Sequence, residues 1–192
     1  MKLRTLFAGI FLALTLTVAQ ADEPQVYFSR SDPVARILAR EIDAAQKTIH
    51  VLVYSLTDSA LMDALVRAAD RGVDVKVVLD KSQSEGNSSL ADAMVTRLGE
   101  KRVQIRSGKG RGSMHEKMAI YDGLTVTLGS FNWTANARDN NWENLIVLRD
   151  ARLAASCERE FQRIWASPAP KPPKSDSKGK AAPAAKPKPK KN

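Results

Sequence analysis

Residues 48–79, TIHVLVYSLTDSALMDALVRAADRGVDVKVVL, decide the fold of this 192-residue chain. The first seven of them, TIHVLVY, are β-branched and nearly all apolar, which is typical of a strand covered on both faces. Apolar residues then recur at helical spacing after a capping residue, Thr57 or Asp58, and Gly72 stands where the helix should end. A second apolar segment, 73–79, completes a strand–helix–strand unit, which predicts a right-handed crossover between parallel strands.

The segments on either side continue this alternation. Upstream, a strand at 25–29 precedes a helix that begins at Ser31-Asp32-Pro33, and we expect Asp32 to cap its first turn. Downstream, Asp122 and Gly123 separate two short apolar segments, the pattern of a β-hairpin. The other predicted elements are a helix at 87–98 closed by Gly99, strands at 103–106, 116–121, 125–128 and 144–148, and a helix at 151–165. Together they predict an α/β fold with a mixed, largely parallel sheet flanked by helices.

The two ends of the chain differ in composition from its middle. Residues 1–21 have a basic start, an apolar stretch and small residues at Ala19 and Ala21, the layout of a signal peptide cleaved after Ala21. Residues 167–192 hold seven of the nine prolines and eight lysines without a large apolar side chain, which predicts a disordered Lys/Pro-rich tail. The folded domain is then expected at 22–166, in a protein that is periplasmic or secreted and has no stable membrane insertion after signal cleavage.

The net charge of +9 is carried by the ends. The leader contributes +2 and the tail +7, so the remaining body has 20 basic and 20 acidic residues. Bulk charge therefore gives no reason to treat the body as a general polyanion binder. One local excess remains in the basic loop that contains Arg106, Lys109 and Arg111, which is either a clamp for a nucleic-acid backbone or a solvated charged loop.

Few residues in this chain can bind metals or form disulfides. The single cysteine, Cys157, excludes an intramolecular disulfide. Two histidines, His50 and His115, leave little room for a histidine-rich metal site. We therefore expect no metal and no cofactor.

The candidate chemistry lies in the sequence HEKMAIYDGLTVTLGSFN, which starts at His115. Residues two apart in a strand share a face, so His115 and Lys117 could meet one phosphate, the lysine neutralising its charge while the imidazole attacks or transfers a proton. The hairpin would return Ser130 and Asn132 to the same end, where both can donate hydrogen bonds to phosphate oxygens. Glu143 begins the next predicted strand and is a candidate for orienting a histidine nitrogen.

This spacing, His-x-Lys-x4-Asp-x6-Gly-Ser-x-Asn, resembles the HKD signature of the phospholipase D superfamily, and it is most similar to small bacterial endonucleases with one such motif per chain. The resemblance covers residues 22–166. It implies a metal-independent, two-step cleavage of a phosphodiester, in which one histidine forms a phosphohistidine and a second protonates the leaving oxygen before water releases the product. It further implies that Lys117 and Asn132 stabilise the transferring group, and that Asp122 and Gly129 are structural.

A mechanism with two histidines needs a second HKD motif, and the chain has one. His50 lies in an apolar segment without a lysine two residues later, so we expect it to have a packing role. The resemblance instead implies a homodimer in which His115 and its symmetry mate face one phosphate.

Three functions fit the sequence. The leading hypothesis is an exported endonuclease that hydrolyses DNA, with RNA left open as a further substrate, and has little sequence specificity. The alternatives are a phospholipid-cleaving phospholipase D and a non-catalytic nucleic-acid-binding protein. The tryptophans are expected mainly in the core or in interfaces, and Trp133, which follows the motif, is the strongest candidate among them for stacking on a nucleobase.

Overall fold

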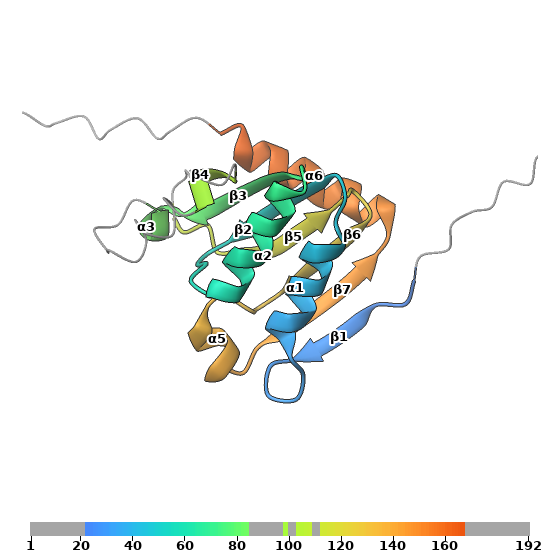
Figure 1. The fold of residues 1–192 in the computed structure, drawn as a ribbon, viewed down its shortest axis with the longest axis vertical. Helices are drawn as coiled ribbons and strands as arrows, with labels where there is room; N and C mark the ends of the chain where they lie inside the picture. The colour runs from blue at the N-terminus through green and yellow to red at the C-terminus, as the bar shows by residue number, and fades with distance from the viewer. Residues whose placement is uncertain (1–21, 85–97, 100–102, 109–111, 168–192) are drawn as a thin grey trace, which may run out of the picture.

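The structure is a computed structural model, drawn in Figure 1. It describes residues 22–84, 98–99, 103–108 and 112–167. The predicted signal peptide, nearly all of the predicted helix at 87–98, Lys109, Arg111 and almost the whole predicted tail lie outside the described residues.

The described elements follow the predicted order. Two short helices, α3 and α5, are additional to the prediction. In chain order the elements are β1 (Gln25–Phe28), α1 (Val34–Ala44), β2 (Thr48–Val53), α2 (Ser59–Asp70), β3 (Asp74–Asp80), α3 (Lys81–Ser84), β4 (Gln104–Gly108), β5 (Lys117–Tyr121), β6 (Thr125–Gly129), α5 (Ala135–Asp139), β7 (Asn144–Arg149) and α6 (Ala151–Trp165).

The described strands form one seven-stranded sheet in the order β1-β7-β6-β5-β2-β3-β4. The pairs β2–β3 and β3–β4 are parallel, as the crossover predicted, whereas the other four described pairs are antiparallel. The sheet is therefore mixed, as predicted, but the expectation that it is largely parallel is wrong. The physical reason is connection length, because β5 and β6 are joined by a tight turn that can only reverse the chain.

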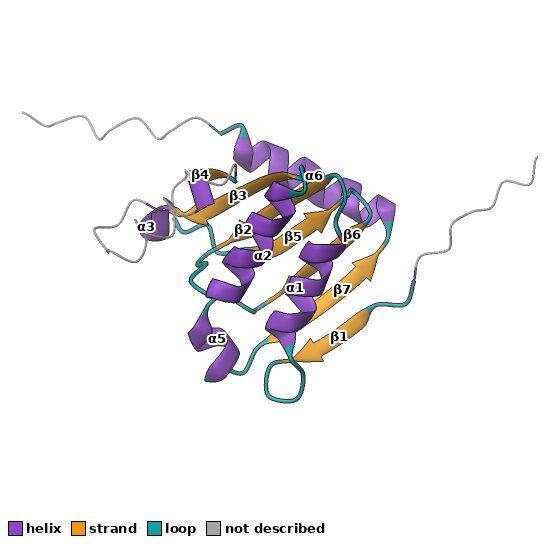
Figure 2. Ribbon diagram, viewed as in Figure 1, coloured by secondary structure: helices purple, strands orange, loops and turns teal. Residues whose placement is uncertain are grey.

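Helices cover both faces of the sheet (Figure 2). Helices α1 and α2 pack side by side on one face, and α6 lies across the other face, against β2, β4, β5 and β6. The larger core cluster lies under α1 and α2, and a smaller one lies under α6, where Phe161 is fully buried. This layered arrangement leaves the end of the sheet at which β2 and β3 terminate free for a site.

The helix starts differ in how they are capped. Asp58 caps α2 as predicted, because its carboxylate accepts hydrogen bonds from the backbone N–H groups of Ala60 and Leu61. Asp32 does not cap α1, so that expectation is wrong. Its carboxylate instead accepts the N–H of Phe28 at 2.8 Å and so closes the turn between β1 and α1.

Asp122 ties the β5–β6 turn to the start of β2. Its carboxylate accepts hydrogen bonds from the backbone N–H groups of residues 46–48, at 2.7–2.9 Å. Asp122 has a positive φ of 53° and Gly123 one of 66°, the left-handed pair that a tight hairpin requires. Burial alone would raise the pKa of Asp122, but the three N–H donors outweigh it and hold the pKa below its ordinary value. Asp122 lies at the far end of β5 from Lys117, so its role is structural.

Replacing Asp122 with Asn, which tolerates the positive φ, is expected to lower the free energy of unfolding at pH 7 by roughly 1–3 kcal/mol, because charge-assisted bonds are lost. The pKa of Asp122 is lower in the folded state than in the unfolded state. Its contribution to stability is therefore fully present above the unfolded-state pKa and disappears as the pH falls through the folded-state pKa. Denaturant unfolding at pH 7 and near pH 3 measures this. The difference between the two proteins should be smaller at the lower pH, and an equal difference at both pH values would contradict the prediction. Asp43→Asn, which breaks an exposed ion pair with Arg67, serves as the control with a small effect.

Candidate active site

One end of the sheet carries the five predicted catalytic residues. Strands β2, β3 and β6 end at this edge, and β5 and β7 begin there, as their pairing shows. The carboxyl ends of parallel strands are the usual location of ligand sites in open α/β sheets. Each motif side chain therefore projects from the end of a strand that the core holds in place.

His115 and Lys117 meet at the start of β5. His115 lies two residues before the first residue of the strand, and it is exposed. The side chains nevertheless converge, since Lys117 Nζ lies 3.1 Å from His115 Nδ1 and donates to the His115 carbonyl oxygen at 2.7 Å. The ring of Tyr54, at the end of β2, packs beside both: its centroid is 5.1 Å from that of His115 and 5.5 Å from Lys117 Nζ.

The Ser130 hydroxyl already forms hydrogen bonds within the protein. Its hydroxyl donates to Glu143 Oε2 at 2.5 Å and accepts the N–H of Asn144 at 3.1 Å. A hydroxyl has one proton to donate, so in this arrangement Ser130 cannot also donate to a phosphate oxygen, as the sequence suggested. Its contacts make Ser130 the group that positions Glu143.

Glu143 is held from a second side. Asn141 Nδ2 donates to Glu143 Oε1 at 2.8 Å. The hydroxyl of Ser29 donates to the Asn141 carbonyl and accepts the N–H of Glu143. The described contacts of the Glu143 carboxylate are thus with Ser130 and Asn141, and its role in orienting a histidine nitrogen stays a prediction.

Asn132 has an unsatisfied amide. Among the described residues its Oδ1 is buried without a hydrogen-bond partner. A buried amide left unpaired costs free energy unless a ligand or water completes it. A half-turn of the Asn132 amide exchanges its oxygen and nitrogen, so Asn132 can present an N–H donor at this position.

Asp80 holds the segment that leads to His115. Its carboxylate accepts the N–H of Met114 at 2.7 Å and the Ser113 hydroxyl at 2.9 Å, and it also caps α3 through Ser82. Burial acts to raise the pKa of Asp80, but these donors lower it on balance.

Sequence reasoning missed Asp80, Tyr54, Ser29 and Asn141. Asp80 and Tyr54 end the two buried parallel strands, and this position is a signal that could have identified them. Ser29 and Asn141 carry no such signal, because only the folded chain brings them to Glu143.

The electrostatics of the site depend on Lys117 and Glu143. Burial lowers the pKa of Lys117 below its ordinary value, and the negative charge of Glu143 opposes this shift. The ammonium of Lys117 at the start of β5 and the carboxylate of Glu143 just before β7 therefore interact across the site.

The structure places the other predicted binding residues elsewhere. Trp133 is 2% exposed and packs in the core, where its backbone pairs with Leu56, so the expectation that it stacks on a base is wrong. Arg106 lies on β4, and its side chain is not described. Lys109 and Arg111 lie outside the described residues, so the backbone clamp stays a prediction.

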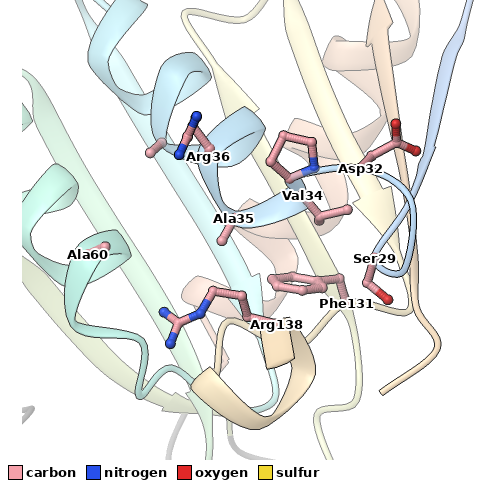
Figure 3. A pocket seen from close by; sticks show the side chains of 10 residues that line it. Ser29, Asp32, Val34, Ala35, Arg36, Ala60, Phe131 and Arg138 are labelled. Carbon is pink, nitrogen blue, oxygen red and sulfur yellow. The ribbon is translucent and has the colours of Figure 1, made fainter. Parts of the chain in front are cut away.

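A cavity of about 430 Å³ lies behind the site, between α1, α2 and α5 (Figure 3). Figure 3 shows Phe131 and Arg138 on one side of it and the first turn of α1 on the other. Phe131 separates Ser130 from Asn132 in the chain, yet none of the five predicted catalytic residues lines this cavity. Arg138 pairs with the buried carboxylate of Asp58, so the cavity adjoins a structural ion pair.

The described part of the chain lacks two kinds of feature. It contains no group of three His, Cys, Asp or Glu side chains placed to bind a metal ion. None of its helices combines the length and apolarity needed to cross a membrane.

The fold and the motif agree with comparisons to known proteins. Residues 38–165 match the family model described as "Cardiolipin synthase, PLD-like domain". The chain therefore belongs to the phospholipase D superfamily.

Its relatives are of two kinds. Nuc from Salmonella typhimurium, a phospholipase D family member of known structure, is 31% identical with a TM-score of 0.70, and the match covers 76% of this chain and 95% of Nuc. A phospholipase D from Rickettsia bellii is 36% identical over 67% of this chain and 62% of its own length. A mitochondrial cardiolipin hydrolase from Chlamydomonas reinhardtii is 32% identical over 67% of this chain and 57% of its own length. The chain thus spans about three fifths of these two longer relatives and nearly all of Nuc.

Proposed function

We propose that this protein is an exported, metal-independent endonuclease that hydrolyses DNA, with RNA as a further substrate, from a homodimeric composite site. The observation that carries the proposal is the pair of His115 and Lys117 at the open sheet edge, where an imidazole and an ammonium can meet one phosphate. Export rests on the predicted signal peptide.

The choice of a nucleic acid over a lipid rests on charge. The relatives named phospholipase D and cardiolipin hydrolase carry less weight, because the chain spans less than two thirds of their length. The basic residues that precede His115 in sequence suit a polyanion. Phospholipid cleavage is the second candidate, because the names of those longer relatives favour it.

The chemistry begins with the state of the imidazole. While Lys117 donates to Nδ1, a neutral His115 carries its proton on Nε2 and cannot attack from that atom. A bound phosphate would draw the ammonium of Lys117 to its oxygens and free Nδ1 to take the ring proton. Nε2 then attacks phosphorus, the new P–N bond forms as the P–O bond breaks, and the leaving oxygen takes a proton.

That proton requires a second acid. His50 cannot supply it, because it is 7% exposed, stacks on Phe161 of α6 and has its Nδ1 2.9 Å from the Glu158 carboxylate. A symmetry-related His115 facing the same phosphate supplies it in our proposal and then activates the water that hydrolyses the P–N bond.

The test is a substrate panel with full-length mature protein in EDTA. Plasmid DNA, RNA and choline-phospholipid vesicles are incubated separately with the protein and with His115→Ala. Nucleic-acid cleavage that His115→Ala abolishes is the expected result. Choline release without nicking would replace the proposal with the lipid alternative, and binding without turnover would leave a non-catalytic protein.

The proposal also predicts how the site responds to pH. Burial lowers the pKa of Lys117 and Glu143 raises it, so removing the carboxylate in Glu143→Gln should lower that pKa further. The cation is then lost at lower pH, and the alkaline limb of the kcat/KM profile should move to lower pH. Lys117→Arg should remove this limb, because guanidinium stays charged. The control is Asp43→Asn, which removes an exposed carboxylate on α1 and should leave the alkaline limb in place. An unchanged limb in Glu143→Gln would show that Lys117 and Glu143 do not interact.

A further inference from the structure

The most exposed large apolar side chain among the described residues is Trp142, at 83%. Isolated exposed apolar residues are common on proteins, but Trp142 is not isolated. Phe28, at 55% exposure, faces Asn144 in the β1–β7 register, and Asn144 lies two residues after Trp142 in the chain. Both exposed aromatic residues thus belong to the β1–β7 side of the sheet end that carries the site.

The indole is paired with a cation. The guanidinium carbon of Arg30 lies 5.5 Å from the centre of the Trp142 ring, and Arg30 donates a hydrogen bond to the Asp139 carbonyl. The backbones that carry both side chains are joined by the hydrogen bonds between Ser29 and Glu143. We call this surface the Trp142–Arg30 platform.

The platform lies next to the catalytic groups. Trp142 directly precedes Glu143, and β7 is two strands away from β5 in the sheet. Neighbouring strands are about 4.8 Å apart, and Trp142 lies three residues, roughly 10 Å, before Leu145, the residue of β7 that is level with Lys117. The backbone of the platform is therefore about 14 Å from the start of β5, which equals about four stacked nucleotides of a strand, and fewer in an extended one.

We infer that the Trp142–Arg30 platform stacks on an unpaired base of a nucleic-acid strand whose phosphate lies at His115. The inference rests on the proposed function and adds that unpaired strands are favoured, because bases inside a duplex are stacked on each other and cannot reach the indole. Arg30 covers one side of the indole and leaves the other for the base, and its charge complements the neighbouring phosphates.

Binding measurements test the platform independently of turnover. Fluorescence anisotropy would compare a single-stranded oligonucleotide with an abasic oligomer of equal length and charge, in the non-cleaving His115→Ala background. Trp142→Ala should weaken binding of the base-bearing strand roughly tenfold. The abasic strand should change by about twofold or less. Trp142→Phe should recover most of the loss, and Leu124→Ala, which removes a 58%-exposed side chain at the opposite sheet edge, should change neither.

Three other outcomes overturn the inference. Equal losses for both strands would show that Trp142 acts without touching bases. Dissociation of the dimer in sedimentation of Trp142→Ala would assign the platform to a second copy of the chain. Loss of binding to anionic vesicles alone would assign it to a lipid surface. If the wild-type protein cleaves no nucleic acid, yet Trp142→Ala removes base-dependent binding, the proposed function is refuted while the base-binding role of the platform stands.

Discussion

Replacing His115 with alanine is expected to lower the rate of phosphodiester hydrolysis by about 10³-fold or more, because both the nucleophile and, through the symmetry mate, the general acid are lost. The exposed His115 makes no packing contact that the core depends on, so the unfolding midpoint should stay close to that of the wild type. Initial rates on plasmid DNA in EDTA, together with a thermal scan, measure both quantities.

His50→Gln is the matched control, since it alters the other histidine of the chain. His50 lies under α6, stacked on Phe161 and bonded to Glu158, so this change should lower stability while kcat is retained. A loss of kcat as large as that of His115→Ala would mean that His50 supplies the second imidazole, and the composite dimer would then be wrong.

Mixing the two forms of the protein tests the composite site directly. When equal amounts of wild type and His115→Ala exchange subunits at random, a shared site leaves activity only in wild-type homodimers, roughly one quarter of the total. Sites that work independently would leave half of the activity. An active preparation that sediments as a monomer would exclude the shared site altogether.

Gly129→Ala is the change with the largest expected effect on the fold around the site. A Cβ at Gly129 would lie 2.3 Å from the carbonyl oxygen of Asn144 and 2.8 Å from its side-chain oxygen. A backbone atom cannot swing aside, so β6 and β7 must separate just where Ser130 bonds to Asn144 and Glu143. We expect a loss of roughly 1–3 kcal/mol in unfolding free energy, which corresponds to a fall in Tm of about 2–10 °C.

The same substitution should also reduce activity, because Ser130 and Glu143 move with the strand ends. Gly99→Ala is its control, since an added Cβ there meets nothing within 4 Å and the backbone has no positive φ. If Gly129→Ala unfolded at the same temperature as Gly99→Ala, the close approach of β6 and β7 would not be a constraint on this position.

The order of elements and the motif could be read from the sequence because both depend on local patterns. Periodicity and caps placed α2 and α6, and turn chemistry at Asp122 and Gly123 placed the hairpin. The spacing of the motif was sufficient to bring His115 and Lys117 together, since side chains two residues apart meet even where the strand begins later than predicted.

Contacts between distant segments could not be read in this way. Trp133 and Trp142 are the same residue type on either side of a short helix, yet one is 2% exposed and the other 83%. The burial of each ring depends on what the fold packs against it, and no local sequence pattern predicts that packing. In the same way, the Ser130 hydroxyl is a donor available to phosphate in the sequence, and it becomes a positioning group once β7 brings Glu143 within hydrogen-bond distance.

The residue types and their spacing were thus enough to predict the longer helices and the strands, and to propose which side chains carry phosphoryl chemistry. The direction of most strand pairs, the burial of each aromatic ring and the partner of each polar hydrogen depended on the folded chain. These properties arise from segments far apart in sequence, whose contacts form only when the sheet assembles and its faces are covered.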